Sequence, residues 1–138
     1  MGLGKLQSLN MKENLIEVFL NHAFKSMKSL KELNIMSNRM KRLKKHALSG
    51  LNDLFILNLS DNLMEEVPKE SNKKLQKVKN LKKLSLQDNL LEEERTYSFA
   101  SFHKLEELSI GQNKFSVISD GVFRGSAKLT KLQITGCL

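Results

Sequence analysis

Apolar and polar residues follow one another along the chain in a pattern that occurs six times. One copy begins at Leu30 and reads LKELNIMSNRM, with apolar residues at its first, fourth, sixth and eleventh positions and an asparagine at its ninth. The copies begin at Leu6, Leu30, Leu54, Leu81, Leu105 and Leu129. Successive starts lie 24 residues apart, except for 27 between the third and the fourth. A fixed period of this length indicates stacked coils, each of which is too small to bury its apolar face alone.

The fourth and sixth positions of each copy predict a short β-strand. In the second copy, Leu33 and Ile35 would point to one face of the strand, whereas Asn34 and Met36 would point to the other. Stacked copies therefore predict a parallel sheet with a continuous apolar core behind it. The opposite face of this sheet is expected to be an exposed, concave surface.

An asparagine follows each of the first five predicted strands, where the backbone loses its ladder partners. An amide side chain has both donors and an acceptor, so we expect this row to bridge backbone groups within and between coils. The row consists of Asn14, Asn38, Asn62, Asn89 and Asn113, with Cys137 in the same place in the last copy. By contrast, Asn58 is expected to face solvent and to contribute little to stability.

The line L-x-x-L-x-L-x-x-N/C-x-L with this period resembles the leucine-rich repeat family. The resemblance covers Leu6 to Leu138 and implies an α/β solenoid, a right-handed horseshoe with short parallel strands on its concave face. The convex side would be irregular or would carry short helices. A phenylalanine row in the second half of the copies is similar to that of Toll-like receptors, Slit and small leucine-rich proteoglycans. Glu94 and Ser126 depart from this pattern at positions where it has apolar residues.

The 138 residues are expected to form a single array, residues 1–138, without terminal caps. Because the resemblance implies cysteine-rich caps and neither is present, we expect a fragment of a longer protein. The sequence contains no run of about 18 apolar residues, so it predicts no transmembrane segment. The resemblance implies an extracellular or cell-surface location, within a secreted protein or a membrane receptor that takes part in signalling. A complete chain would instead be cytoplasmic.

The concave face is the first candidate binding surface, and a protein ligand is its expected partner. Its candidate residues are Glu32, Asn34, Met36, Ile56, Asn58, Asp61, Lys83, Gln87, Asp88 and Glu107. Met36 and Ile56 are expected to be exposed apolar residues on adjacent strands that seed a contact, although scattered apolar surface residues are also common. We expect this face to be mildly acidic, although the chain carries a net charge of +8.

Basic residues gather elsewhere, on the predicted turns and back of the second and third copies. The candidates are Arg39, Lys41, Arg42, Lys44, Lys45, Lys73, Lys74 and Lys77. A patch of this kind attracts polyanions, such as heparan sulfate or a nucleic-acid backbone, or an acidic protein. No aromatic residues interleave with it, so sequence-specific recognition of nucleic acid is not expected. An ordinary solvated, lysine-rich surface is the alternative.

The sequence does not favour an enzyme, a cofactor or a metal site. Asp61 and Asp88 share the eighth position of adjacent copies, yet they lie on an open surface without a third ligand. His22 and His46 also share a position and also lack further ligands. Asn58 begins the single glycosylation sequon of the chain, and a glycan there would obstruct the concave face. Protein recognition by the concave face is therefore the favoured function, with polyanion binding by the basic convex patch as the alternative.

Overall fold

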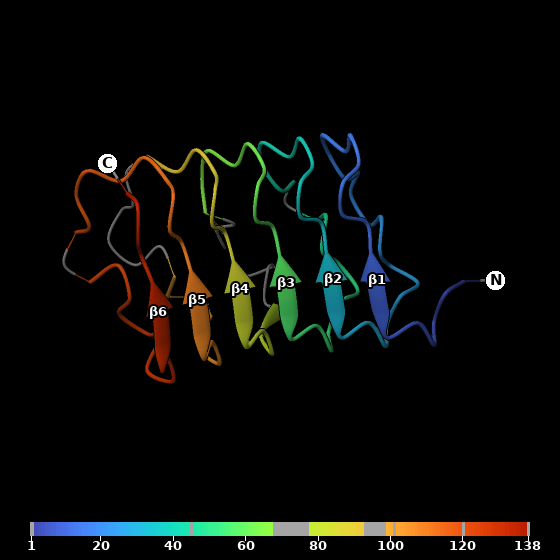
Figure 1. The fold of residues 1–138 in the computed structure, drawn as a ribbon. Coiled ribbons are helices and arrows are strands. Elements are labelled where there is room, and N and C mark those ends of the chain that lie inside the picture. The colour runs from blue at the N-terminus through green and yellow to red at the C-terminus, as the bar shows by residue number, and fades with distance from the viewer. Residues whose placement is uncertain are drawn as a thin grey trace.

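Six short parallel strands form the framework of the computed structural model, which describes residues 2–44, 46–67, 78–92, 99–100, 102–119 and 121–137. They are β1 (Ser8–Asn10), β2 (Glu32–Asn34), β3 (Ile56–Asn58), β4 (Lys83–Ser85), β5 (Glu107–Ser109) and β6 (Lys131–Gln133). The strands pair in chain order, one from each coil, in a single sheet (Figure 1). This arrangement confirms the predicted solenoid.

The apolar core lies directly behind the sheet. The central leucines of β2 to β5 pair in register with one another and are at most 2% exposed. The first leucine of each inner coil is fully buried, as Leu54 and Leu81 illustrate. Burying one leucine side chain contributes about 1.5–3 kcal/mol. The repeated apolar positions therefore hold the coils together, as the sequence predicts.

The side of each coil opposite the sheet consists mainly of turns in the described residues, and a partial phenylalanine row packs beneath them. Phe24 and Phe99 are buried, and the ring of Phe99 stacks on that of Phe123 with centroids 5.7 Å apart. Ser126 is also buried, although its place in the repeat is normally apolar. Its hydroxyl donates a 3.1 Å hydrogen bond to the carbonyl of Phe99, which explains how a polar residue is accommodated there. Glu94 lies outside the described residues.

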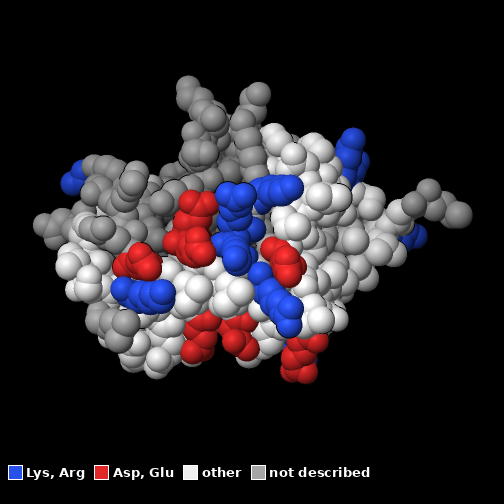
Figure 2. All heavy atoms as spheres, turned by 90° about the horizontal axis from the view of Figure 1, so that it is seen from above, with Lys and Arg blue, Asp and Glu red and all other residues white. Residues whose placement is uncertain are grey.

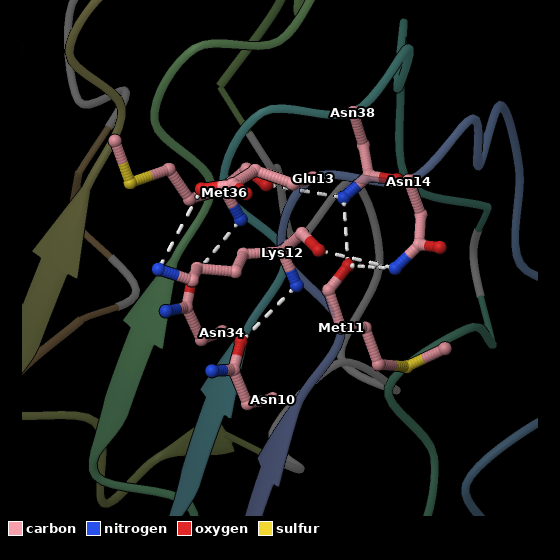
Figure 3. A network of polar contacts seen from close by, with 8 residues as sticks. All are labelled: Asn10, Met11, Lys12, Glu13, Asn14, Asn34, Met36 and Asn38. Atoms are coloured by element: carbon pink, nitrogen blue, oxygen red, sulfur yellow. Dashed lines mark hydrogen bonds and ion pairs between the residues drawn. The ribbon is translucent and has the colours of Figure 1, made fainter.

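The asparagine row is buried from the second coil to the fifth, and it bridges neighbouring coils as predicted. Figure 3 shows the first bridge, in which the Asn38 amide donates to the carbonyl of Met11 in the preceding coil over 3.0 Å. The Asn38 oxygen accepts the backbone N–H of Ile16, also over 3.0 Å. Cys137 takes the same place in the last coil, with its sulfur 3.8 Å from the carbonyl oxygen of Ile110.

The residue before each of these side chains adopts a left-handed backbone conformation, with φ between 51° and 70°. These residues are Glu13, Ser37, Asp61, Asp88, Gln112 and Gly136. The N–H of each of the first five donates to a carbonyl of the next coil, as from Asp61 to Gln87 over 2.9 Å. This turn aims the ninth residue inward, and it was not predicted from the sequence.

Candidate functional site

The concave face of the sheet carries two shallow hollows that share a border at Ile56 and Asn58. One hollow lies over β1, β2 and β3, where Glu32 and Asn34 line it. The other extends from β3 to β6. Its lining includes the predicted residues Lys83, Gln87 and Glu107, together with Ser85, Ser109, Lys131 and Gln133. The structure thus places most of the candidate concave residues in one continuous hollowed surface.

Asparagines at the fifth position of the first three coils form short turns along this surface. The side-chain oxygens of Asn10 and Asn34 accept the backbone N–H groups of Lys12 and Met36 over 3.1 and 3.0 Å (Figure 3). In the third coil, the side-chain oxygen of Asn58 likewise accepts the backbone N–H of Ser60. Because the oxygen is engaged, each amide orientation is fixed, and Nδ2 is left without a protein acceptor in the described part of the chain. Sequence reasoning missed this role, although the recurrence of asparagine at this position was an available signal.

Hydroxyl and amide side chains continue this line of polar groups along the concave face toward the last strand. The side-chain oxygen of Asn58 accepts both the N–H of Ser60, over 3.0 Å, and its hydroxyl, over 2.6 Å. The same hydroxyl lies 2.5 Å from the hydroxyl of Ser85. The hydroxyl of Ser109 donates to Gln87 over 3.1 Å. Asn58 lines both hollows but is half-buried in this network, so it faces solvent less than expected.

Two of the four charged residues on the six strands pair with each other across neighbouring strands. Lys83 lies 3.2 Å from Glu107, and the adjacent Lys82 lies 3.1 Å from Glu106. Glu32 and Lys131 have no such partner within the described ranges. Asp61 and Asp88 are exposed beyond the strand ends, and they too form no ion pair with a described residue.

The two apolar candidates differ in their exposure. Met36 is 38% exposed, as predicted. Ile56 is half-buried, so the prediction of an exposed side chain is wrong. The register places Ile56 between Glu32 and Lys83 on the neighbouring strands, and flanking side chains of this length cover part of an isoleucine.

The predicted basic patch is described in part. Arg39, Lys41, Arg42 and Lys44 are exposed, whereas Lys45, Lys73, Lys74 and Lys77 lie outside the described residues. The acidic residue Glu65 adjoins one of the described members, since its backbone N–H donates to the carbonyl of Lys41 over 3.2 Å. Figure 2 shows basic and acidic side chains interspersed on the surface seen from above. The described part of this region therefore carries both signs of charge.

The structure brings together no metal site from the remaining candidates. The rings of His22 and His46 stack, with centroids 5.4 Å apart and planes 11° apart, which is not a chelating arrangement. No group of three or more potential metal-ligating side chains occurs among the residues described. Among these residues there is also no helix with the length and apolar character needed to cross a bilayer.

The family model for "Leucine rich repeat" matches residues 1–40, 28–78 and 79–138. No curated protein sequence matches the chain. Solved structures with the same fold include the leucine-rich repeat domain of APL1B, with a TM-score of 0.81 and 20% identity over 96% of this chain. A chain from the octameric complex of Latrophilin 3, Unc5D and FLRT2 gives a TM-score of 0.83 and 27% identity over 95% of this chain.

A third similar structure comes from the Drosophila Toll–Spatzle complex, with a TM-score of 0.80 and 19% identity over 88% of this chain. These likenesses support the solenoid fold independently of the repeat pattern. The chain spans 38%, 39% and 16% of the APL1B, Latrophilin 3–Unc5D–FLRT2 and Toll–Spatzle chains, respectively.

Proposed function

The chain belongs to the leucine-rich repeat family, and we propose that it is a non-catalytic module that binds a protein ligand through the concave face of its sheet. The observation that carries this proposal is the continuous hollowed surface over β1 to β6. Its lining includes polar groups without partners among the described residues, such as Glu32, Lys131 and the Nδ2 group of Asn34. A rigid surface with pre-oriented polar groups favours binding because little conformational entropy is lost on association.

The similar structures support protein binding as the general kind of activity. Two of them are complexes with other proteins, namely Latrophilin 3 with Unc5D and FLRT2, and Toll with Spatzle. We further propose that the present chain forms one repeat array within a longer extracellular or cell-surface protein.

Site-specific photo-crosslinking tests the proposal. A photoreactive residue at Met36 on the concave face is expected to capture a protein, which mass spectrometry identifies, whereas one at Lys25 on the back is not. The purified partner is then expected to lose its affinity for the double variant M36D/I56D, with thermal unfolding as the control for folding. Capture from Lys25 but not from Met36 would contradict the proposal.

Polyanion binding is the second candidate, and it is favoured by the four exposed basic residues between Arg39 and Lys44. Replacing Arg39, Lys41, Arg42 and Lys44 by glutamate separates the two functions. If the concave face binds a protein, these replacements alter mainly the association rate and its salt dependence. If a polyanion is the partner, they abolish binding to heparin, and M36D/I56D has no effect on it.

A further inference from the structure

The third positions of the coils form one continuous row of side chains across the concave face. Glu32 pairs in register with Ile56, Ile56 with Lys83, Lys83 with Glu107, and Glu107 with Lys131. Neighbouring parallel strands are about 4.8 Å apart, so the row places Glu32 and Lys131 about 19 Å from each other. These two residues are the outermost charged residues of the row, which Ser8 on β1 continues by one more strand.

The charges along this row are arranged as a dipole. Lys83 and Glu107 neutralise each other at 3.2 Å in the middle of the row. The residues that remain are Glu32 at one end and Lys131 at the other, and neither has an ion-pair partner in the described part of the chain. A partner that matches the row therefore needs a cation at the β2 end and an anion at the β6 end.

The surface between the two charges suits an extended peptide. The strands are three residues long, so the face is about 10 Å wide, which accommodates one extended chain. The Nδ2 groups of Asn34 and Asn58 are donors for backbone carbonyl oxygens. An extended chain presents such carbonyls unpaired, whereas a helix has already satisfied most of its own. Beside Glu32, the half-buried Ile56 offers apolar contact area.

We propose that the concave face binds an extended segment of its partner, with a basic side chain against Glu32, an aliphatic one against Ile56 and an acidic one against Lys131. At about 3.4 Å per residue, with alternate side chains on the same face, these three residues occupy positions i, i+2 and i+6. This inference rests on the proposed function and adds the chemistry and the order of the contacts. Charge complementarity of this kind fixes the register of a ligand more than it raises its affinity.

Two capped heptapeptides of identical composition test the order of the charges. KSLSSSE matches the row, whereas ESLSSSK places its acidic residue beside the leucine and so opposite Glu32. Titration into the isotopically labelled chain, followed by NMR, is expected to shift the backbone amides of β2 to β6. We expect KSLSSSE to bind about threefold to tenfold more tightly than ESLSSSK. With its leucine against Ile56, ESLSSSK loses both solvent-exposed ion pairs, and in the reverse direction it keeps them but loses the leucine contact.

The double variant E32K/K131E provides the matched control, because it keeps the net charge and changes two exposed side chains. It is expected to reverse the preference and to bind ESLSSSK more tightly. Equal affinities for both peptides, an unchanged preference in the variant, or no shifts at millimolar peptide would overturn the inference. The peptides can fail these tests while a photoreactive residue at Met36 still captures a protein and M36D/I56D still abolishes the binding of that protein. In that case only the proposed order of charges in the ligand is wrong. Capture from Lys25 alone would instead contradict the proposed function.

Discussion

The side-chain amide of Asn62 donates a 3.0 Å hydrogen bond to the carbonyl of Ile35, which belongs to the preceding coil. The same amide donates to the carbonyls of Leu59 and Ser60 over 3.2 and 3.1 Å. Its oxygen accepts the N–H of Met40 over 2.9 Å. One buried side chain thus satisfies backbone groups of two coils that no strand pairing reaches.

Replacing Asn62 by alanine is therefore expected to lower the free energy of unfolding by about 1–3 kcal/mol, because buried backbone groups lose their partners. N62D should be equally harmful, since a carboxylate cannot donate to carbonyls. Urea titration measures both effects. N14A is the control, because the exposed Asn14 donates to carbonyls of its own coil alone among the described residues, and its loss should be smaller. Equal losses in N62A and N14A would contradict this role of the row.

Ser126 provides a second test of buried polar pairing. Its place in the repeat is normally apolar, yet its hydroxyl donates to the carbonyl of Phe99 over 3.1 Å. S126A should lower the free energy of unfolding by about 1 kcal/mol, because the carbonyl loses its donor. The exposed Ser116 is the control, and S116A should change stability by less than about 0.5 kcal/mol. A gain in stability for S126A in urea titration would show that the apolar consensus still holds at this position.

The strands, the buried leucines and the asparagine row could all be predicted from the sequence. Each depends on alternation within one coil and on the repeat between coils, and both can be read from the spacing of residues such as Leu33 and Ile35. The left-handed turn at the eighth position could not be predicted from the sequence. It is occupied by residues as different as Glu13, Ser37 and Gln112, so no shared side chain signals it.

The candidate site was predicted less completely than the fold. Strand alternation correctly assigns Glu32 and Lys83 to the concave face. It says nothing of how far neighbouring strands cover a side chain, and so it overestimates the exposure of Ile56. It also cannot distinguish a paired charge such as Lys83 from Lys131, which has no ion-pair partner among the described residues, because ion pairing depends on contacts between coils.

Close approach of backbones at Gly111 leads to a third prediction. A Cβ atom there would lie 2.7 Å from the carbonyl oxygen of Thr135 in the next coil, so the backbone would have to shift. G111A should lower the free energy of unfolding by about 1–3 kcal/mol, the usual cost of overpacking. At Gly4, a Cβ would meet Ser26 at an ordinary 3.6 Å, so G4A is the matched control. Thermal unfolding of the two variants should show a lowered midpoint for G111A alone.

For Asn58, the structure and the sequence-based expectation lead to different contributions to the free energy of unfolding. Its oxygen accepts both the N–H and the hydroxyl of Ser60, which is 8% exposed. N58A should therefore lower the free energy of unfolding by about 1 kcal/mol. That value exceeds the 0.5 kcal/mol or less that is usual for a solvent-facing residue.

The control at the same coil position is Asn10, whose exposed oxygen accepts the N–H of Lys12 alone among the described residues. N10A should lower the free energy of unfolding by less than about 0.5 kcal/mol. N58D retains an acceptor oxygen for Ser60, so it should preserve more stability than N58A while removing the glycosylation sequon. The variant thus separates the hydrogen-bonding role of Asn58 from any effect of a glycan. If N58A and N10A unfold at the wild-type urea midpoint, the bonds to Ser60 contribute nothing to the stability of the third coil.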